Sequence, residues 1–242
     1  MNSRDAILQK IRSSMVPFPE TSVPELKPLQ PAENPSVETM KKTFADALES
    51  LTGRFFWVEN LSDVRETLEN LARENGWTKF SSFPHPLLES VLPREFFHGK
   101  GKKNLYLGEK GEHSNSCGGE NCAVRGETDK NRLAELPVSL VFPQFLIAET
   151  GTCVVLNRSA HERLNCYLTP ACVMIAPVSA LRENLQSAWD SVAETTASSL
   201  TDETLRGEFV LVTGPSRTAD IERVSVLGVH GPKMLAVIVY GE

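Results

Sequence analysis

The chain has 242 residues, of which 40% are hydrophobic and 23% charged, and its formal net charge is −6. These values lie in the ordinary range of globular proteins and exclude a fibrous or wholly disordered chain. Acidic and basic residues are interspersed and the total is negative, which argues against a surface that neutralises nucleic-acid phosphates. The length suffices for one large α/β domain, or for a main domain with an arm.

The sequence predicts neither a secretion signal nor a membrane span. Its first residues bring a charge every few positions where a signal peptide has an apolar stretch, and no apolar run is long enough to cross a bilayer. The five cysteines are an odd number, and three of them lie in or beside apolar stretches: Cys153, Cys166 and Cys172. A reduced cysteine there behaves as a small hydrophobic residue, so we expect a soluble, cytoplasmic protein.

The beginning of the chain predicts an arm. Within residues 3–14 three apolar residues recur at helical spacing, Ile7, Leu8 and Ile11. Residues 15–35 then bring a proline every few positions, a composition typical of an extended connector. We therefore expect residues 1–35 to form an N-terminal helix and Pro-rich linker, and residues 36–242 to form the α/β domain. The apolar side of the helix would pack on its own domain or on a neighbouring subunit of a homo-oligomer, and the sequence leaves both open.

From Ser36 onward helical and strand patterns alternate. A first helical face is formed by Val37, Met40, Phe44 and Leu48. Gly53 is a plausible stop for this helix, and a buried strand follows at 54–59. Ser62 is expected to cap a second helix, ended by Gly76, whose inward residues are Val64, Leu68 and Leu71. This order of elements is typical of a mixed α/β sheet.

The alternation resumes after a less regular middle. Residues 86–97 predict a short helix, 104–108 a short strand, and 108–127 a polar, glycine-rich loop. Apolar runs then predict two or three strands within 137–156 and another at 171–177. A long amphipathic helix follows, with a face formed by Leu181, Leu185, Ala188, Trp189 and Val192. The closing segment predicts strand 209–213, a short helix from about Thr218 to Val226, and strand 234–239.

One candidate site is the stretch "LVTGPSRTADIE", in which a glycine turn separates a strand from the polar start of the predicted helix. Backbone N–H groups at a helix N-terminus, hydroxyls and a guanidinium together favour an anion. A turn at the carboxyl end of a strand also lies where open α/β sheets bind ligands. The candidate ligand-binding residues are Gly214, Ser216, Arg217, Thr218 and Asp220. The alternative is that Gly214 and Pro215 form a tight turn and Thr218 caps the helix.

A second candidate site is "AETGT", residues 148–152, at the mouth of a strand. Glu149 suits a general base or an acceptor for a ligand hydroxyl, and the residues beside it are Thr150, Gly151 and Thr152. The alternative is a hairpin turn with an exposed acid. His230 lies in "GVHGP" between two glycines that permit close approach, and is either an acid or base or a hydrogen-bonded structural residue.

No metal or cofactor motif is present. The run from His161 to Asn165 lacks the second histidine of HExxH. His113, Cys117 and Cys122 lack the third nearby cysteine of an iron–sulfur run and the paired cysteines of zinc knuckles. No GxSxG motif supports a hydrolase. We therefore expect no metal and no cofactor in this chain.

Four motifs occur in a specific order: "LIAETGT", then "RL" followed by a proline (Arg163, Leu164, Pro170), then "TGPSRTADIE", then "GVHGPK". Together they resemble the LUD-domain family, and within it the lactate utilisation protein C group. The resemblance spans about residues 36–242. It implies a Rossmann-like, three-layer α/β/α domain related to the sugar-phosphate isomerase and CoA-transferase-like folds.

The resemblance further implies a role in oxidising L-lactate to pyruvate, beside iron–sulfur partner proteins that carry the electrons. The first hypothesis is a cytoplasmic subunit that binds a small anionic ligand without holding a redox centre. The second is a stand-alone isomerase-like or transferase-like enzyme acting on a small phosphorylated or carboxylated metabolite. A structural scaffold is the third. If the first hypothesis holds, we expect the turn with Gly214 and the turn with Glu149 to share one cleft. The turn with Gly214 would bind the anion, and Glu149 and His230 would face it.

Overall fold

The computed structural model describes residues 3–13, 35–83, 85–92, 105–106, 133–157, 163–197, 208–219 and 225–241. The chain divides into two compact units, Met1–Asn34 and Pro35–Glu242. Helix α1 (Ser3–Ser13) belongs to the first unit, and its Ile7 and Leu8 are 59% and 37% exposed. Every other described element belongs to the second unit. None of the described helices is long and apolar enough to cross a membrane.

The second unit starts with a helix, a strand and a helix, as predicted. Helix α2 (Val37–Ser50) begins after Ser36, whose hydroxyl accepts a hydrogen bond from the backbone N–H of Thr39 at 3.1 Å. Strand β1 (Arg54–Val58) connects it to helix α3 (Leu61–Asn75). Both helices bury one apolar stripe, which is why their sequences repeat at helical spacing.

The N-cap of α3 is Asn60, so the prediction of Ser62 was wrong. Asn60 Oδ1 accepts hydrogen bonds from the backbone N–H groups of Ser62 and Asp63, at 2.8 and 3.1 Å. Asn60 also has the extended backbone that an N-cap requires, whereas Ser62 already lies inside the helix. The predicted end at Gly76 is confirmed, since this glycine adopts the left-handed conformation with φ 68°.

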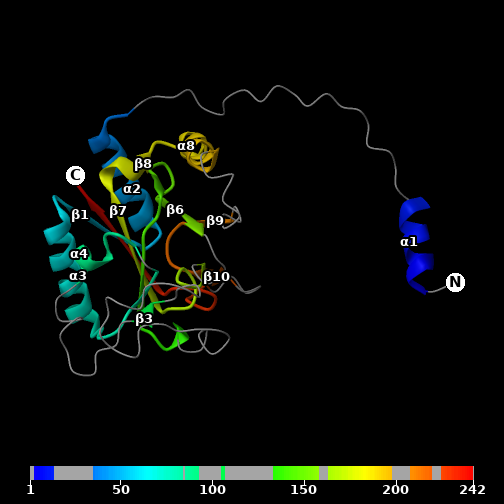
Figure 1. Ribbon diagram of the computed structural model, residues 1–242, viewed down its shortest axis with the longest axis horizontal. Helices are drawn as coiled ribbons and strands as arrows, with labels where there is room; N and C mark the ends of the chain where they lie inside the picture. The colour runs from blue at the N-terminus through cyan, green and yellow to red at the C-terminus, as the bar shows by residue number, and fades with distance from the viewer. Residues whose placement is uncertain are drawn as a thin grey trace. The chain divides into compact units, whose positions relative to one another are not determined.

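A six-stranded parallel sheet forms the centre of the second unit (Figure 1). Its strand order is β1-β12-β7-β4-β2-β3. Its other strands are β2 (Ser81–Ser82), β3 (Leu105–Tyr106), β4 (Val138–Val141), β7 (Ala171–Pro177) and β12 (Met234–Tyr240). All of its pairings are parallel. The two longest strands, β7 and β12, lie inside the sheet with both faces covered, which explains their nearly continuous apolar sequences. The predicted α/β fold is confirmed.

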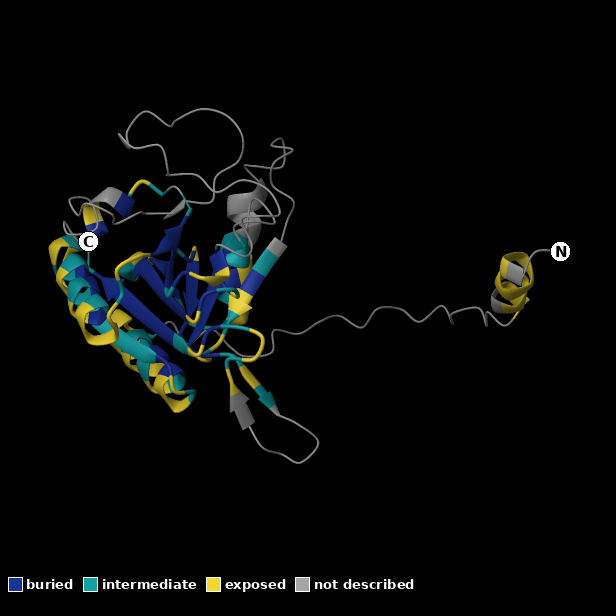
Figure 2. Ribbon diagram, turned by 90° about the horizontal axis from the view of Figure 1, so that it is seen from below, coloured by how far each residue is buried: buried dark blue, intermediate teal, exposed yellow. Residues whose placement is uncertain are grey.

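Helices cover both faces of this sheet. On one face, α3 and the short helix α4 (Leu88–Val91) pack against alternate residues of the central strands, among them Val173 and Ile238. On the opposite face, α2 inserts Phe44 and Leu48 against Met174 and its neighbours. Figure 2 shows the sheet as a buried layer and the exposed residues on the outward sides of the helices.

A second sheet packs beside α2 on that face, with the strand order β8-β5-β6-β9. Its strands are β5 (Phe145–Ile147), β6 (Thr152–Asn157), β8 (Leu181–Arg182) and β9 (Glu208–Val212). β6 runs antiparallel to both β5 and β9. Helix α8 (Leu185–Ala197) covers the outer side of the sheet through Ala188. The sequence predicted these strands but not that they form a sheet of their own.

The long helix predicted from Leu181 starts four residues later. Leu181 belongs to β8, where it pairs with Leu146, and its side chain is buried in the core. A helix starting at Leu181 would have to give up this pairing with β5. The 3₁₀ turn Val178–Ala180 connects β7 directly to β8.

The predicted helix from Thr218 to Val226 is wrong. Two short antiparallel strands lie there, β10 (Arg217–Ala219) and β11 (Ser225–Leu227), in which Thr218 pairs with Val226. β-Branched residues such as Thr218 and Val226 favour such strands, whereas the helix had been expected from the polar residues that follow the glycine turn. Of the middle of the chain, α4 lies within the predicted helix 86–97 and β3 within 104–108, while loop 108–127 lies outside the described residues.

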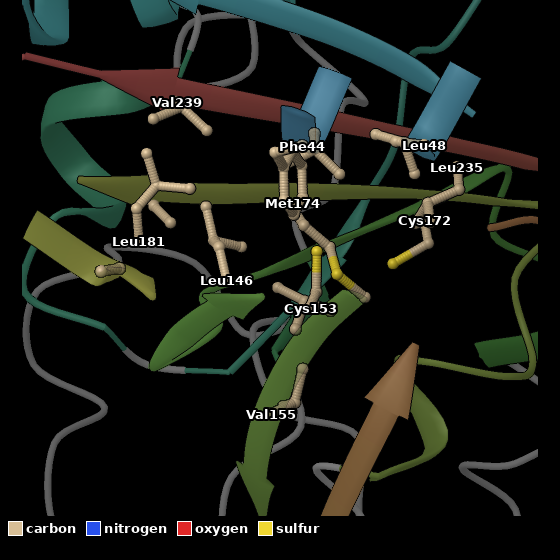
Figure 3. Packing of buried hydrophobic residues seen from close by; sticks show 14 of the residues in the cluster. Phe44, Leu48, Leu146, Cys153, Val155, Cys172, Met174, Leu181, Leu235 and Val239 are labelled. Atoms are coloured by element: carbon tan, nitrogen blue, oxygen red, sulfur yellow. The ribbon is translucent and has the colours of Figure 1, made fainter. Parts of the chain in front are cut away.

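Cys153, Cys166 and Cys172, which were expected to behave as small hydrophobic residues, lie in one buried core cluster and form no disulfide. Figure 3 shows Cys153 and Cys172 among their apolar neighbours. Burial raises the pKa of the Cys172 thiol to about 12, although a hydrogen bond with Ser139 lowers it in part. Burial also raises the pKa of Cys153, and the neighbouring Cys172 and Cys166 raise it further. Cys153 and Cys172 therefore stay protonated and serve as packing residues at neutral pH.

Candidate functional site

Two turns of the second unit meet at the end of α2, and a third turn packs against one of them, so that the three form a cluster. This end consists of Leu48 to Gly53, where the backbone N–H groups of Leu51 and Gly53 both donate to the Leu48 carbonyl. Thr52 adopts a left-handed conformation with φ 66°, which is rare for a β-branched residue. The sequence pointed to Gly53 as the helix stop, but it is Thr52 that takes the left-handed conformation.

The turn "AETGT" joins β5 to β6 and packs directly on α2. Gly151 has φ 63°, and a Cβ atom at this position would lie 2.6 Å from the Leu48 nitrogen. Only glycine therefore fits between the turn and the helix backbone. The backbone N–H groups of Ala148 and Glu149 donate to the carbonyls of Arg182 and Glu183, at 2.8 and 3.0 Å. Glu149 is thus an exposed acid on a rigidly held hairpin turn.

The turn "TGPS" follows β9 and lies beside the first turn. Thr213 Oγ1 and Thr152 Oγ1 are hydrogen-bonded at 2.7 Å, and Thr152 Oγ1 is also bonded to Thr150 Oγ1 at 2.6 Å. Gly214 has φ 85°, and a Cβ atom there would lie 3.0 Å from Leu51 Cβ. Both predicted turns thus meet each other and the same end of α2. Thr213 was not among the predicted residues, although its position before a turn glycine was visible in the sequence.

Arg217 lies against the end of α2. Its Nη2 donates to the Leu51 carbonyl at 2.8 Å and to Thr52 Oγ1 at 2.9 Å. Among the described residues, Nη1 and Nε of this exposed side chain have no partner, so they remain available to a ligand. The guanidinium thus holds the turn in place and still faces solvent.

The helix N-terminus that the sequence placed behind Gly214 does not exist. The Ser216 N–H donates to the Pro232 carbonyl at 2.8 Å, and the Gly228 N–H donates to the Ser216 carbonyl at 2.9 Å. Thr218 belongs to β10, and Asp220 lies outside the described residues. Any anion site here would depend on side chains, since the Ser216 backbone donor is already used.

The third turn contains His230 and leads into β12. Gly231 packs against Ser216, because a Cβ atom on Gly231 would lie 2.9 Å from Ser216 Cβ. His230 itself is exposed. Gly228 adopts φ 75° under the side chain of Lys233. The turn containing His230 is therefore packed against the turn containing Ser216.

The cluster of turns lies at the amino edge of the central sheet. Thr52 precedes β1, and Pro232, whose carbonyl binds Ser216, precedes β12. The sequence placed this site by the rule that ligands bind at the carboxyl ends of strands in open α/β sheets. The rule does not apply here, because β9 belongs to the second, largely antiparallel sheet.

The "RL…P" motif supports the sheet. The Pro170 carbonyl accepts from the backbone N–H groups of Lys233 and Met234, which aligns β12 beside β7. Next to the motif, the buried Asn165 accepts from Ser81 Oγ at 2.6 Å, and Thr169 Oγ1 donates to Ser139 Oγ at 2.9 Å. The sequence does not reveal this buried polar network, because isolated polar residues in apolar runs carry no spacing signal.

In the parts of the chain that the structure describes, no three His, Cys, Asp or Glu side chains are grouped so that they could hold a metal ion. His113, Cys117 and Cys122, the metal candidates of the sequence, lie outside the described residues. His161 does so too. The predicted site residues that the structure describes offer hydroxyls, one guanidinium, one carboxylate and one imidazole.

Comparisons with known proteins agree with these motifs. The family model of the LUD domain matches residues 41–240. Lactate utilization protein C of Bacillus subtilis (strain 168) is 29% identical over 120 residues, 50% of this chain and 49% of that protein. Its counterpart from Geobacillus thermodenitrificans (strain NG80-2) is 32% identical over 107 residues, 42% of this chain and 41% of that protein. The matches thus span about half the length of these relatives or less.

A solved structure shares the fold. A DUF162 family protein from Deinococcus radiodurans superposes with a TM-score of 0.53 and 16% sequence identity. The superposition covers 86% of this chain and 99% of that one. At this identity the likeness concerns the fold alone.

Proposed function

The chain belongs to the LUD-domain family, and on that premise we propose that it is a cytoplasmic component of a system that oxidises L-lactate to pyruvate. In this proposal, iron–sulfur partner proteins carry the electrons. The chain contributes a site for a small anionic ligand at the cluster of turns around the end of α2. The support is the family match over residues 41–240 and the relatives named lactate utilization protein C.

The three buried cysteines support the division of labour between this chain and its partners. They are enclosed by apolar side chains of the core, and the pKa values of Cys153 and Cys172 are raised. A cluster ligand must be a thiolate, which this environment disfavours. We therefore assign electron transfer to the partners.

The observation that carries the proposed site is the convergence of two turns, far apart in the sequence, on one helix end. Gly151 and Gly214 permit the close approach, and the Thr152–Thr213 hydrogen bond joins the turns. Nη1 and Nε of Arg217 would bind the anionic group, assisted by the Ser216 hydroxyl. Glu149 and His230 are the candidates for proton transfer, because both are exposed on turns of the cluster.

The test is co-purification with iron–sulfur partners followed by L-lactate-dependent reduction of a dye. We expect activity only with the partners present, and a roughly tenfold lower rate in both Arg217→Ala and Arg217→Lys, because lysine cannot reproduce the forked contact. Arg217 also binds Leu51 and Thr52, so both variants should melt a few degrees lower, about 2–4 °C for about 1 kcal/mol.

Arg73→Ala serves as the matched control, since Arg73 lies on α3 and bonds only Asn70 among the described residues. The proposal fails if Arg217→Ala leaves partner-dependent oxidation unchanged. Turnover of a phosphorylated or carboxylated metabolite by the chain alone would favour the isomerase or transferase alternative.

A further inference from the structure

Three threonine hydroxyls from two turns form a continuous chain of hydrogen bonds. Thr150 Oγ1 is bonded to Thr152 Oγ1 at 2.6 Å, and Thr152 Oγ1 to Thr213 Oγ1 at 2.7 Å. Thr152 in the middle is only 3% exposed, whereas Thr150 and Thr213 at the two ends are exposed. The hydroxyl chain therefore has a buried residue in its middle and an exposed residue at each end.

Because each hydroxyl has only one proton, the two hydrogen bonds of this hydroxyl chain must point in the same direction along it. A hydroxyl carries one proton and two lone pairs. Within the described structure Thr152 bonds only Thr150 and Thr213 through its hydroxyl, so accepting from both would leave its own buried proton without an acceptor. Thr152 thus accepts from one neighbour and donates to the other.

This direction makes the two ends chemically different. The end hydroxyl that donates to Thr152 has used its proton and presents only lone pairs outward. The opposite end accepts from Thr152 and has its own proton to donate outward. Whichever way the chain runs, a ligand therefore meets one donor end and one acceptor end. The two ends are at most two hydrogen-bond lengths apart, so one small molecule can reach both.

We propose that this hydroxyl chain selects a small 2-hydroxy carboxylate over the corresponding keto acid. A carboxylate accepts from the donor end, and the neighbouring hydroxyl donates to the acceptor end. A keto acid offers acceptors only and leaves the acceptor end without a donor. In this proposal Thr213, whose turn leads to Arg217, is the donor end and binds the carboxylate, and Thr150, next to Glu149, is the acceptor end and binds the ligand hydroxyl. The inference rests on the proposed function in that L-lactate is the 2-hydroxy carboxylate to be tested.

The experiment is titration of the full chain, without partners, with the sodium salts of L-lactate, pyruvate and propionate at constant ionic strength, followed by NMR. The native chain should bind L-lactate about tenfold more tightly than either other acid, the size of one hydrogen bond. Thr152→Val removes the central hydroxyl and should abolish this preference, while Thr152→Ser should retain it. Thr169→Val is the matched control, because Thr169 is equally buried but bonds Ser139 and Ala171 instead.

Equal affinities for L-lactate and pyruvate in the native chain would overturn the inference, as would a preference that survives Thr152→Val. If that variant does not fold, Thr213→Val at the exposed end replaces it, with the same loss of preference expected. Failure of the proposed function looks different. The chain would then bind L-lactate selectively, while no combination with iron–sulfur partners would oxidise it.

Discussion

Gly151 and Gly76 share a left-handed backbone but differ in what surrounds them. Their φ values are 63° and 68°, yet a Cβ atom at Gly151 would lie 2.6 Å from the Leu48 nitrogen, whereas one at Gly76 would meet nothing within 4 Å. The conformational cost of an L-residue is therefore the same at both sites, and only Gly151 adds a steric cost. Substitutions at Gly76 and Gly151 therefore separate the cost of backbone strain from the cost of a steric clash.

We expect Gly76→Ala to lower the free energy of unfolding by about 1 kcal/mol, from backbone strain alone. Gly151→Ala should cost about 1–3 kcal/mol more, because the new methyl group must push the turn away from α2. Urea denaturation of both variants measures the difference. Equal losses would show that the turn does not press on the helix.

The left-handed backbone of Thr52 could not be predicted from the sequence. Its left-handed backbone would suit glycine, and Gly53 follows it directly. Thr52 is nevertheless held in place, because its hydroxyl accepts from Arg217 and its N–H donates to the Glu49 carbonyl. A contact with a residue so distant in sequence leaves no trace in local propensity.

At the scale of single elements, the start of α3 depends on one amide side chain. Asn60→Ala removes the acceptor for two backbone N–H groups and should lower the free energy of unfolding by about 1 kcal/mol. Ser62→Ala should change it by less than about 0.5 kcal/mol, because Ser62 contributes only its backbone N–H to the cap. Thermal melting of both variants tests this. A larger loss of stability in Ser62→Ala than in Asn60→Ala would show that Ser62 caps the helix, as the sequence suggested.

Elements with strong periodicity could be predicted, and those defined by pairing could not. α2, α3, β7 and β12 appear where the apolar spacing placed them. Leu181 continues the apolar spacing of α8 but lies in β8, since pairing with β5 competes with helix extension. The segment after Arg217 looks helical by polarity, yet it pairs with itself as β10 and β11. In both cases backbone hydrogen bonds to another strand outweigh weak local preference.

For the whole second unit, the buried thiols link stability to pH. Burial raises the pKa of Cys172 to about 12 in the folded chain, whereas a cysteine of the unfolded chain, with its ordinary pKa of 9.0, ionises earlier. Because the folded pKa is raised, the stabilising contribution is complete below about pH 9 and is lost as the pH rises toward 12.

We therefore expect the free energy of unfolding to fall between pH 9 and 11, by about 1.4 kcal/mol per pH unit for each such thiol. The variant Cys172→Ala should have a lower free energy of unfolding at neutral pH. Between pH 9 and 11 this free energy should fall less than in the native chain, because one titrating thiol has been removed. Urea denaturation at several pH values measures both slopes. Identical slopes in the native chain and the variant would contradict the assignment.

The division into two units predicts that the arm is dispensable for folding. Met1–Asn34 and Pro35–Glu242 form separate compact units, and the core clusters consist of residues from the second. Deleting residues 1–34 should leave a chain with an α/β circular dichroism spectrum and a cooperative melting transition. An insoluble or molten product would instead make the arm part of the core or of an obligate subunit contact.

The sequence by itself determined the α/β class and most helices and strands, because periodicity and turn glycines are local properties of the chain. The family was indicated by the resemblance of its four ordered motifs. The sequence also identified both turns of the proposed site. Only the tertiary structure decided what those turns touch. Arg217 reaches Leu51 across 166 positions, and Thr152 reaches Thr213 across 61. Such contacts arise when the second sheet packs beside α2, and no spacing within either segment encodes them. The proposed site therefore depends on side chains at the end of α2 and not on the expected helix N-terminus, since β10 and β11 pair where the helix was expected.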